Sequence, residues 1–159
     1  MLVHGALADY RSADSLAARL GAHYRVIRYS RRYHWPNAAT VPITDYSPQL
    51  HARDLVEFIR ALKLPPVLIV AHSYGGLVAV LAAVSAQELV RTLTLAEPAT
   101  LSIIEGTPEM EARRKQQAEI TDKLHKLLNA GKSREAVEEF AEWVRGNDGG
   151  FVKSSSAQR

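Results

Sequence analysis

The sequence predicts an α/β fold in which a mostly parallel sheet is flanked by helices and followed by a helical segment at the C-terminal end. Segments typical of strands and of helices alternate over residues 1–98, as in parallel sheets with right-handed crossovers. Residues 67–71 are apolar without interruption, which favours a strand buried on both faces. Beyond residue 99 the chain becomes charged with apolar residues at helical spacing, which indicates helices outside the sheet.

The core elements follow from local patterns along the chain. Apolar, β-branched or aromatic stretches predict strands at 2–3, 24–29, 67–71 and 91–96. Apolar residues at helical spacing, or runs of small residues, predict helices at 12–20, 48–62 and 77–86. Ser47 is the expected N-cap of the middle helix, with Pro48 in its first position. Three prolines within 30–48 predict a long loop before it.

The last third predicts two helices and a tail. A charged helix over 108–129 ends at Gly131, and Ser133 is expected to cap a second helix that carries Phe140 on its apolar face. We therefore divide the chain into a core at 1–98, a helical lid or cap segment at 99–150 and a disordered tail at 151–159.

Composition excludes several functional classes. The chain has 159 residues, enough for one ordinary domain, and no cysteine, so it has neither disulfides nor thiolate metal ligands. No apolar run is long enough to cross a membrane, and the start has no signal-peptide pattern, so a cytoplasmic protein is expected. The net charge of +3 comes without any basic tract, which argues against nucleic-acid binding. No clustered metal-ligand set or phosphate-binding loop is visible, so no cofactor is expected, and nothing in the pattern specifies an oligomeric state.

The strongest chemical signal is the pentapeptide at 71–75, Ala-His-Ser-Tyr-Gly. It lies between a predicted buried strand and a helix of small residues, the context in which a serine is held at the apex of a tight turn. Small residues two positions before and after the serine avoid collisions in that strained turn, and Ala71 and Gly75 satisfy this requirement. Ser73 is therefore the candidate nucleophile. The alternative is that Ser73 only caps the following helix.

A second signal lies upstream in the sequence His4-Gly5-Ala6. A serine nucleophile needs backbone N–H groups directed at the developing oxyanion, one from the residue after the serine and one from an earlier loop. The amides of Tyr74 and Ala6 are the expected donors, although an ordinary turn explains His4-Gly5 equally well.

The motifs at 2–9, 71–76 and 93–98 resemble the α/β-hydrolase superfamily, in its branch with a serine nucleophile. The resemblance covers residues 2 to about 145 and implies esterase-like hydrolysis of a small ester or acyl substrate, with the helices after Pro98 in place of the lid. It also implies a chain incomplete at both ends, because further strands carry the catalytic acid and histidine in the family. His125, the only histidine after Ser73, is expected to be a solvated helix position, and Glu97 is a weak candidate for the acid.

Two alternatives to an active hydrolase remain. In the first, the chain is a non-catalytic fragment or pseudo-enzyme that acts through binding, since a serine without its base is a poor nucleophile. In the second, the helical pair at 108–145 is a recognition module, although one hairpin is too short for a repeat array.

Overall fold

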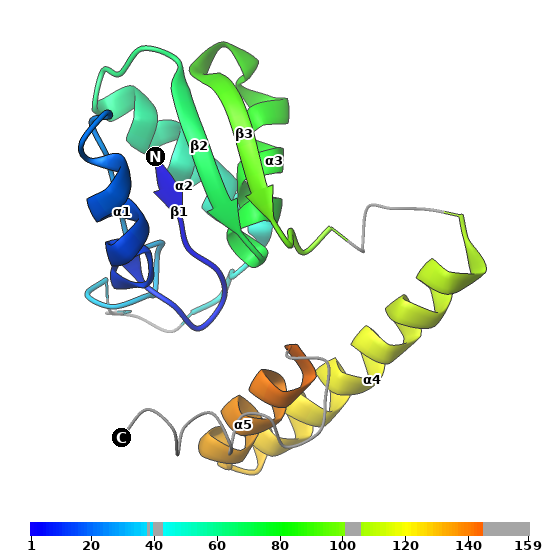
Figure 1. Cartoon of the computed structure of the whole chain (residues 1–159). Coiled ribbons are helices and arrows are strands. Elements are labelled where there is room, and N and C mark those ends of the chain that lie inside the picture. Colours follow the sequence, from blue (N-terminus) through cyan, green and yellow to red (C-terminus); the bar gives the residue numbers. More distant parts are fainter. Residues whose placement is uncertain (38, 40–42, 101–105, 145–159) are drawn as a thin grey trace. The chain divides into compact units, whose positions relative to one another are not determined.

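The computed structural model describes residues 1–37, 39, 43–100 and 106–144, and divides the chain into two compact units, Met1–Thr100 and Leu101–Arg159. The first unit contains a sheet of three parallel strands in the order β1-β2-β3, formed by Leu2–Val3, Val67–His72 and Val90–Ala96 (Figure 1). Its helices are α1 (Asp14–Leu20), α2 (Pro48–Ala61) and α3 (Tyr74–Ser85), with short 3-10 helices η1 (Tyr10–Ala13) and η2 (Gln87–Leu89). The predicted α/β architecture is confirmed.

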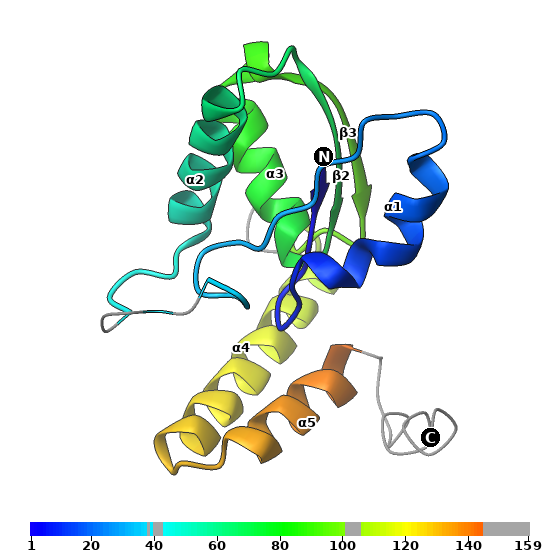
Figure 2. The same ribbon diagram turned by 90° about the vertical axis from the view of Figure 1, so that its left-hand side faces the viewer.

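Two layers of helix flank the sheet unequally. Helices α2 and α3 cover one face, whereas α1 lies on the other (Figure 2). The apolar core is on the α2 and α3 side, where Leu55, Ile59, Ile69, Val78 and Ala79 are at most 1% exposed. The small residues of α3 allow this helix to pack closely on the sheet, as the sequence predicts.

The start of α2 follows from its capping residues. The Ser47 hydroxyl accepts a hydrogen bond from the Leu50 amide, 3.2 Å away, and Pro48 occupies the first turn, where its missing N–H costs nothing. Among the described residues between Tyr29 and Pro48 there is no helix or strand, in agreement with the predicted loop.

Two predictions about the sheet are wrong. Residues 24–29 form no strand; only an isolated parallel bridge joins Arg28 to Leu2, because β1 is two residues long and gives this segment almost no ladder to pair with. Strand β2 is buried on one face only, where Ile69 and Ala71 point into the core. On the other face Leu68 is 38% exposed, and together with Thr92 and Thr94 it lines an open groove of about 470 Å³, because the short α1 leaves this part of the sheet uncovered.

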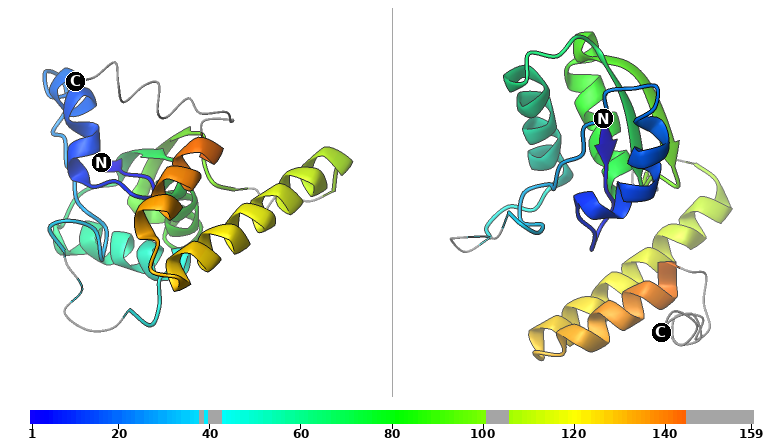
Figure 3. Two further views of the ribbon diagram at one scale, coloured as in Figure 1. Left: turned by 90° about the horizontal axis from the view of Figure 1, so that it is seen from below. Right: turned by 60° about the vertical axis from the view of Figure 1, so that its left-hand side comes forward.

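The second unit is a helical hairpin of α4 (Pro108–Asn129) and α5 (Ser133–Val144), joined at Gly131, which adopts φ +75° (Figure 3). Ile120 and Ala136 are buried between the helices. An ion pair between Lys123 and Glu139 also connects them. The two predicted helices are confirmed, whereas the predicted tail at 151–159 lies outside the described residues.

Candidate active site

The carboxyl ends of the three strands bring the predicted site residues together. In a parallel sheet these ends lie at one edge, where α/β proteins build their sites. The loop that begins at His4 follows β1, Ser73 follows β2 and Glu97 follows β3. The strand register places Val3 beside Ala71, and His72 beside Ala96.

Ser73 has the backbone of a strained turn. Its φ of 51° and ψ of −124° are rarely adopted by a residue with a side chain. Its amide donates to the Ala96 carbonyl at 3.0 Å, and its carbonyl accepts from the Ala99 amide at 3.1 Å, so the segment after β3 holds the turn. Helix α3 begins at the next residue, but the Ser73 side chain makes no capping hydrogen bond to it. The capping alternative for Ser73 is therefore wrong, and its hydroxyl is not used to start the helix.

The two glycines after the turn allow very close backbone approaches. A Cβ atom on Gly75 would lie 2.4 Å from the His4 carbonyl oxygen, and one on Gly76 would lie 2.8 Å from the Pro98 Cβ. Both distances are too short for real contacts. Gly75 therefore keeps the loop after β1 against the turn, and Gly76 does the same for the segment after β3.

The loop after β1 lies directly beside the serine. A Cβ atom on Gly5 would be 3.3 Å from the Ser73 Cβ. The next amide in this loop is that of Ala6, and Tyr74 is the first residue of α3, where backbone amides have no partner within the helix. Among the described residues, no hydrogen bond uses the Ala6 or Tyr74 amide. Two free N–H donors thus belong to the segments that flank Ser73.

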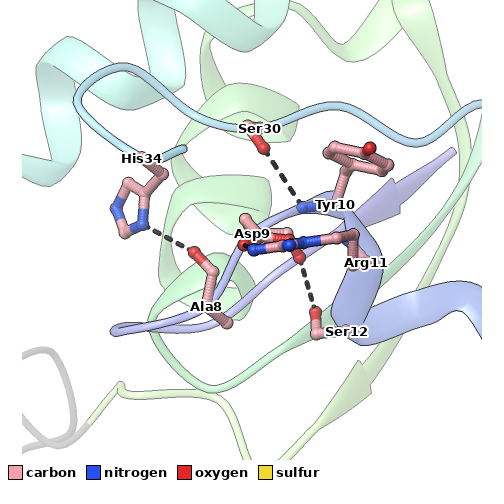
Figure 4. A network of polar contacts seen from close by, with 7 residues as sticks. All are labelled: Ala8, Asp9, Tyr10, Arg11, Ser12, Ser30 and His34. Atoms are coloured by element: carbon pink, nitrogen blue, oxygen red, sulfur yellow. Dashed lines mark hydrogen bonds and ion pairs between the residues drawn. The ribbon is translucent and has the colours of Figure 1, made fainter. Parts of the chain in front are cut away.

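The far end of this loop is fastened to residues 30–34 (Figure 4). The Ser30 hydroxyl accepts from the Tyr10 amide at 3.1 Å, and the His34 Nδ1 lies 2.7 Å from the Ala8 carbonyl. Because a carbonyl only accepts, His34 carries its proton on Nδ1, and its Nε2 then accepts from the Tyr46 hydroxyl. Partial burial lowers the pKa of His34. Two hydrogen bonds from residues 30–34 therefore support the loop after β1.

His4 and Arg31 form a buried polar pair behind the loop. The Arg31 amide donates to His4 Nε2 at 2.9 Å, which leaves Nδ1 as the donor to the Gly5 carbonyl, also at 2.9 Å. The Arg31 side chain donates to the carbonyls of His4 and Gly5 at 3.2 and 2.8 Å. Burial lowers the pKa of His4 to about 4, so its ring is neutral near pH 7 and serves as structural support.

His51 is buried differently. Its ring is 1% exposed, and both nitrogens lack a hydrogen-bond partner among the described residues. It contacts aromatic neighbours edge-on, with its centroid 4.7 Å from that of Tyr46 and 5.9 Å from that of Tyr74. Burial lowers the pKa of His51 to about 4. The His51 ring thus packs as an apolar group against Tyr74, the residue that follows Ser73.

The remaining candidate residues, Glu97 and His125, are exposed. Glu97 adopts φ +46° and is exposed, and among the described residues its carboxylate forms no hydrogen bond or ion pair. His125 is exposed on α4, as expected for a solvated helix position. In the described part of the chain, no histidine nitrogen is hydrogen-bonded to Ser73. Nothing there brings an imidazole and a carboxylate together beside the serine.

No cluster of three or more histidine, aspartate or glutamate side chains within the described ranges is arranged to hold a metal ion. None of the helices described is both long and apolar enough to cross a membrane.

Comparison with known families agrees with this geometry. The profile of the alpha/beta hydrolase family matches residues 1–154. The chain therefore belongs to the alpha/beta hydrolase family, as the resemblance of its motifs predicts.

Individual proteins of known structure or curated sequence are similar to parts of the chain. It is 24% identical to a hydrolase from Pseudomonas aeruginosa PA01, with a TM-score of 0.68 over 87% of this chain and 47% of that one. It is 27% identical to an alpha/beta hydrolase from Sphaerobacter thermophilus, with a TM-score of 0.66 over 89% of this chain and 50% of that one. Over 93 residues it is 29% identical to a Haemophilus influenzae protein named "Putative esterase/lipase", covering 58% of this chain and 31% of the relative. The chain thus spans about half the length of the solved structures and less than a third of the curated relative.

Proposed function

We propose that Ser73 is the nucleophile of a serine hydrolase that acts on small esters or related acyl compounds. The single observation that carries this proposal is the strained backbone of Ser73, whose hydroxyl makes no helix cap. A strained conformation of this kind costs on the order of 1–3 kcal/mol and persists where the surrounding structure enforces it, which is common at catalytic positions. Membership of the hydrolase family and the likeness to an esterase/lipase-named protein support the same chemistry.

The two free amides supply the second half of the mechanism. When the serine oxygen attacks the acyl carbon, the carbonyl oxygen gains negative charge and requires donors fixed in advance. The amides of Ala6 and Tyr74 belong to the two segments that flank Ser73 and are proposed to bind this oxygen. Loss of a single such donor commonly lowers kcat by about 10²–10³-fold.

We propose that the general base is none of His4, His34 and His51, because the surroundings of these three rings leave no nitrogen available to Ser73. His4 and His34 use both ring nitrogens in hydrogen bonds, and His51 is enclosed by aromatic rings. Glu97 is retained only as a proposed acid, because it follows β3 beside the turn that holds Ser73. The α4–α5 hairpin is proposed to belong to the lid segment of the hydrolase.

A fluorophosphonate probe tests the nucleophile in the full chain. We expect covalent labelling of Ser73, found by peptide mass spectrometry, and its complete loss in Ser73→Ala. Ser85→Ala is the matched control, because the Ser85 hydroxyl only donates to the Ala82 carbonyl at the end of α3. A folded chain that remains unlabelled would instead favour the non-catalytic binding protein considered from the sequence.

A further inference from the structure

Arg31 is an unusual residue to find in the interior of this unit. Its side chain is 1% exposed and is the largest of the fully buried side chains. Among the described residues, no carboxylate pairs with it. Burying a guanidinium without a carboxylate partner is costly, so the hydrogen bonds that this group makes must offset part of its desolvation.

Those contacts lead to the loop after β1. Arg31 Nη2 donates to the Gly5 carbonyl at 2.8 Å, and Nε donates to the His4 carbonyl at 3.2 Å. His4 Nδ1 donates to the same Gly5 oxygen at 2.9 Å. Two donors, one of them charged, therefore fix the orientation of a single carbonyl.

The orientation of that carbonyl decides where the next amide points. The Gly5–Ala6 peptide bond is trans, since the cis bond of the described chain is that between Trp35 and Pro36. In a planar trans peptide the C=O and the following N–H point in opposite directions. Holding the Gly5 oxygen toward Arg31 therefore directs the Ala6 N–H away from Arg31. The positive charge on the carbonyl side also polarises the peptide, which makes its N–H a stronger donor.

The same guanidinium contacts the residue that carries the other free amide. Arg31 Cζ lies 4.9 Å from the centroid of the Tyr74 ring, a cation–π distance. The Tyr74 hydroxyl donates to the Tyr46 carbonyl at 3.0 Å, so both the hydroxyl and the face of this ring have a partner. One buried cation thus bridges the two segments that flank Ser73.

We propose that Arg31 is the positioning residue of the oxyanion-binding site, orienting the Ala6 amide through the Gly5 carbonyl and fixing Tyr74 through its ring. This inference rests on the proposed role of Ser73 as nucleophile. The proposal predicts that loss of the Arg31 guanidinium weakens hydrogen bonding to the oxyanion. This effect is distinct from a decrease in the amount of folded protein.

An ester and its thionoester analogue separate these two effects. Sulfur is a weak hydrogen-bond acceptor, so a thionoester benefits less from the two amides than the oxygen ester does. The ratio of kcat/KM for 4-nitrophenyl acetate to that for 4-nitrophenyl thionoacetate is independent of the fraction of folded protein. We expect Arg31→Gln in the full chain to lower kcat/KM for the ester by about 100-fold, as expected for one misdirected donor, and to lower this ratio.

Arg32→Gln is the matched control, because this neighbouring guanidinium binds the half-buried Asp54 carboxylate at 2.6–2.7 Å and, among the described residues, forms no hydrogen bond to the loop after β1 or to Tyr74. It should preserve both the rate and the ratio. If Arg31→Gln does not fold, Arg31→Lys keeps the buried charge without the fork and should lower the ratio in the same direction. A ratio equal to that of the wild type in the folded variant overturns the proposal, even if the rate falls. Hydrolysis by Ser73→Ala at the wild-type rate would instead overturn the proposed nucleophile itself.

Discussion

Two buried histidines make the stability of the first unit sensitive to acid. His4 and His51 are 5% and 1% exposed, and burial lowers the pKa of each to about 4 from an ordinary 6.5. His51 also faces the positive charge of Arg31, which lowers its pKa further, whereas Asp54 acts in the opposite direction. Both rings are consequently neutral in the folded chain at every pH above about 4.

The sign of the effect follows from where the proton binds. Above pH 6.5 both rings are neutral in the folded and the unfolded chain, so their contribution to stability is fully present. As the pH falls from 6.5 toward 4, the unfolded chain binds protons that the folded chain excludes, and this stability is lost. At pH 5 the unfolded pKa is about 1.5 units above the pH, which corresponds to about 2 kcal/mol for each histidine.

Substitution of His51 tests this reasoning. Both ring nitrogens lack partners, so His51→Leu should change the stability near pH 7.5 by less than about 1.5 kcal/mol. It should also reduce the loss of stability between pH 7.5 and pH 5 by about 2 kcal/mol. Urea unfolding followed by the fluorescence of Trp35, in a Trp143→Phe background, measures both quantities.

The control is His23→Leu, because His23 is exposed. It should leave the dependence of stability on pH unchanged. If wild type and His51→Leu lose the same free energy between pH 7.5 and pH 5, the buried ring does not stay neutral and the reasoning is refuted.

Three further substitutions test the strained turn, the close backbone approach at Gly75 and the cap of α2. Ser73→Gly should stabilise the chain by about 1 kcal/mol while abolishing probe labelling, because glycine adopts a φ of 51° without strain; a lower melting temperature than that of the wild type would contradict this. Gly75→Ala should cost at least about 1–3 kcal/mol, since the new Cβ meets a backbone carbonyl oxygen at 2.4 Å, and an unchanged urea midpoint would show that the loop moves freely. Ser47→Ala should cost about 1 kcal/mol through loss of the α2 cap, and Ser85→Ala, measured by the same thermal melt, should cost less.

Much of the fold was predictable because its signals are local. The apolar run that forms β2, the cap at Ser47 and the run of small residues in α3 are each visible in a short stretch of sequence, and the structure confirms the elements they predict. Pairing between strands is not local, and this explains the failure at 24–29: the segment has strand-like residues, but its neighbour β1 offers only a two-residue ladder. The uncovered face of β2 has the same origin, since burial depends on what packs above a strand.

The candidate site divides in the same way. The turn at Ser73, with Gly75 after it, could be predicted because a strained turn tolerates only small residues around it. This requirement is visible in the five consecutive positions 71–75. Arg31 could not be identified, because an arginine in a basic stretch after a predicted strand is indistinguishable from a surface residue. Only the tertiary structure shows that its neighbour Arg32 is exposed and pairs with the Asp54 carboxylate, whereas Arg31 is buried.

The two arginines differ in how costly they are to replace. A surface ion pair such as that of Arg32 contributes at most about 1 kcal/mol and could be replaced at little cost. A buried guanidinium bound to two carbonyls has no such freedom, since removing it leaves those carbonyl oxygens with fewer donors in the interior. The loop beside Ser73 is therefore held by interactions that are costly to rearrange, which is the condition that preorganised binding of a transient anion requires.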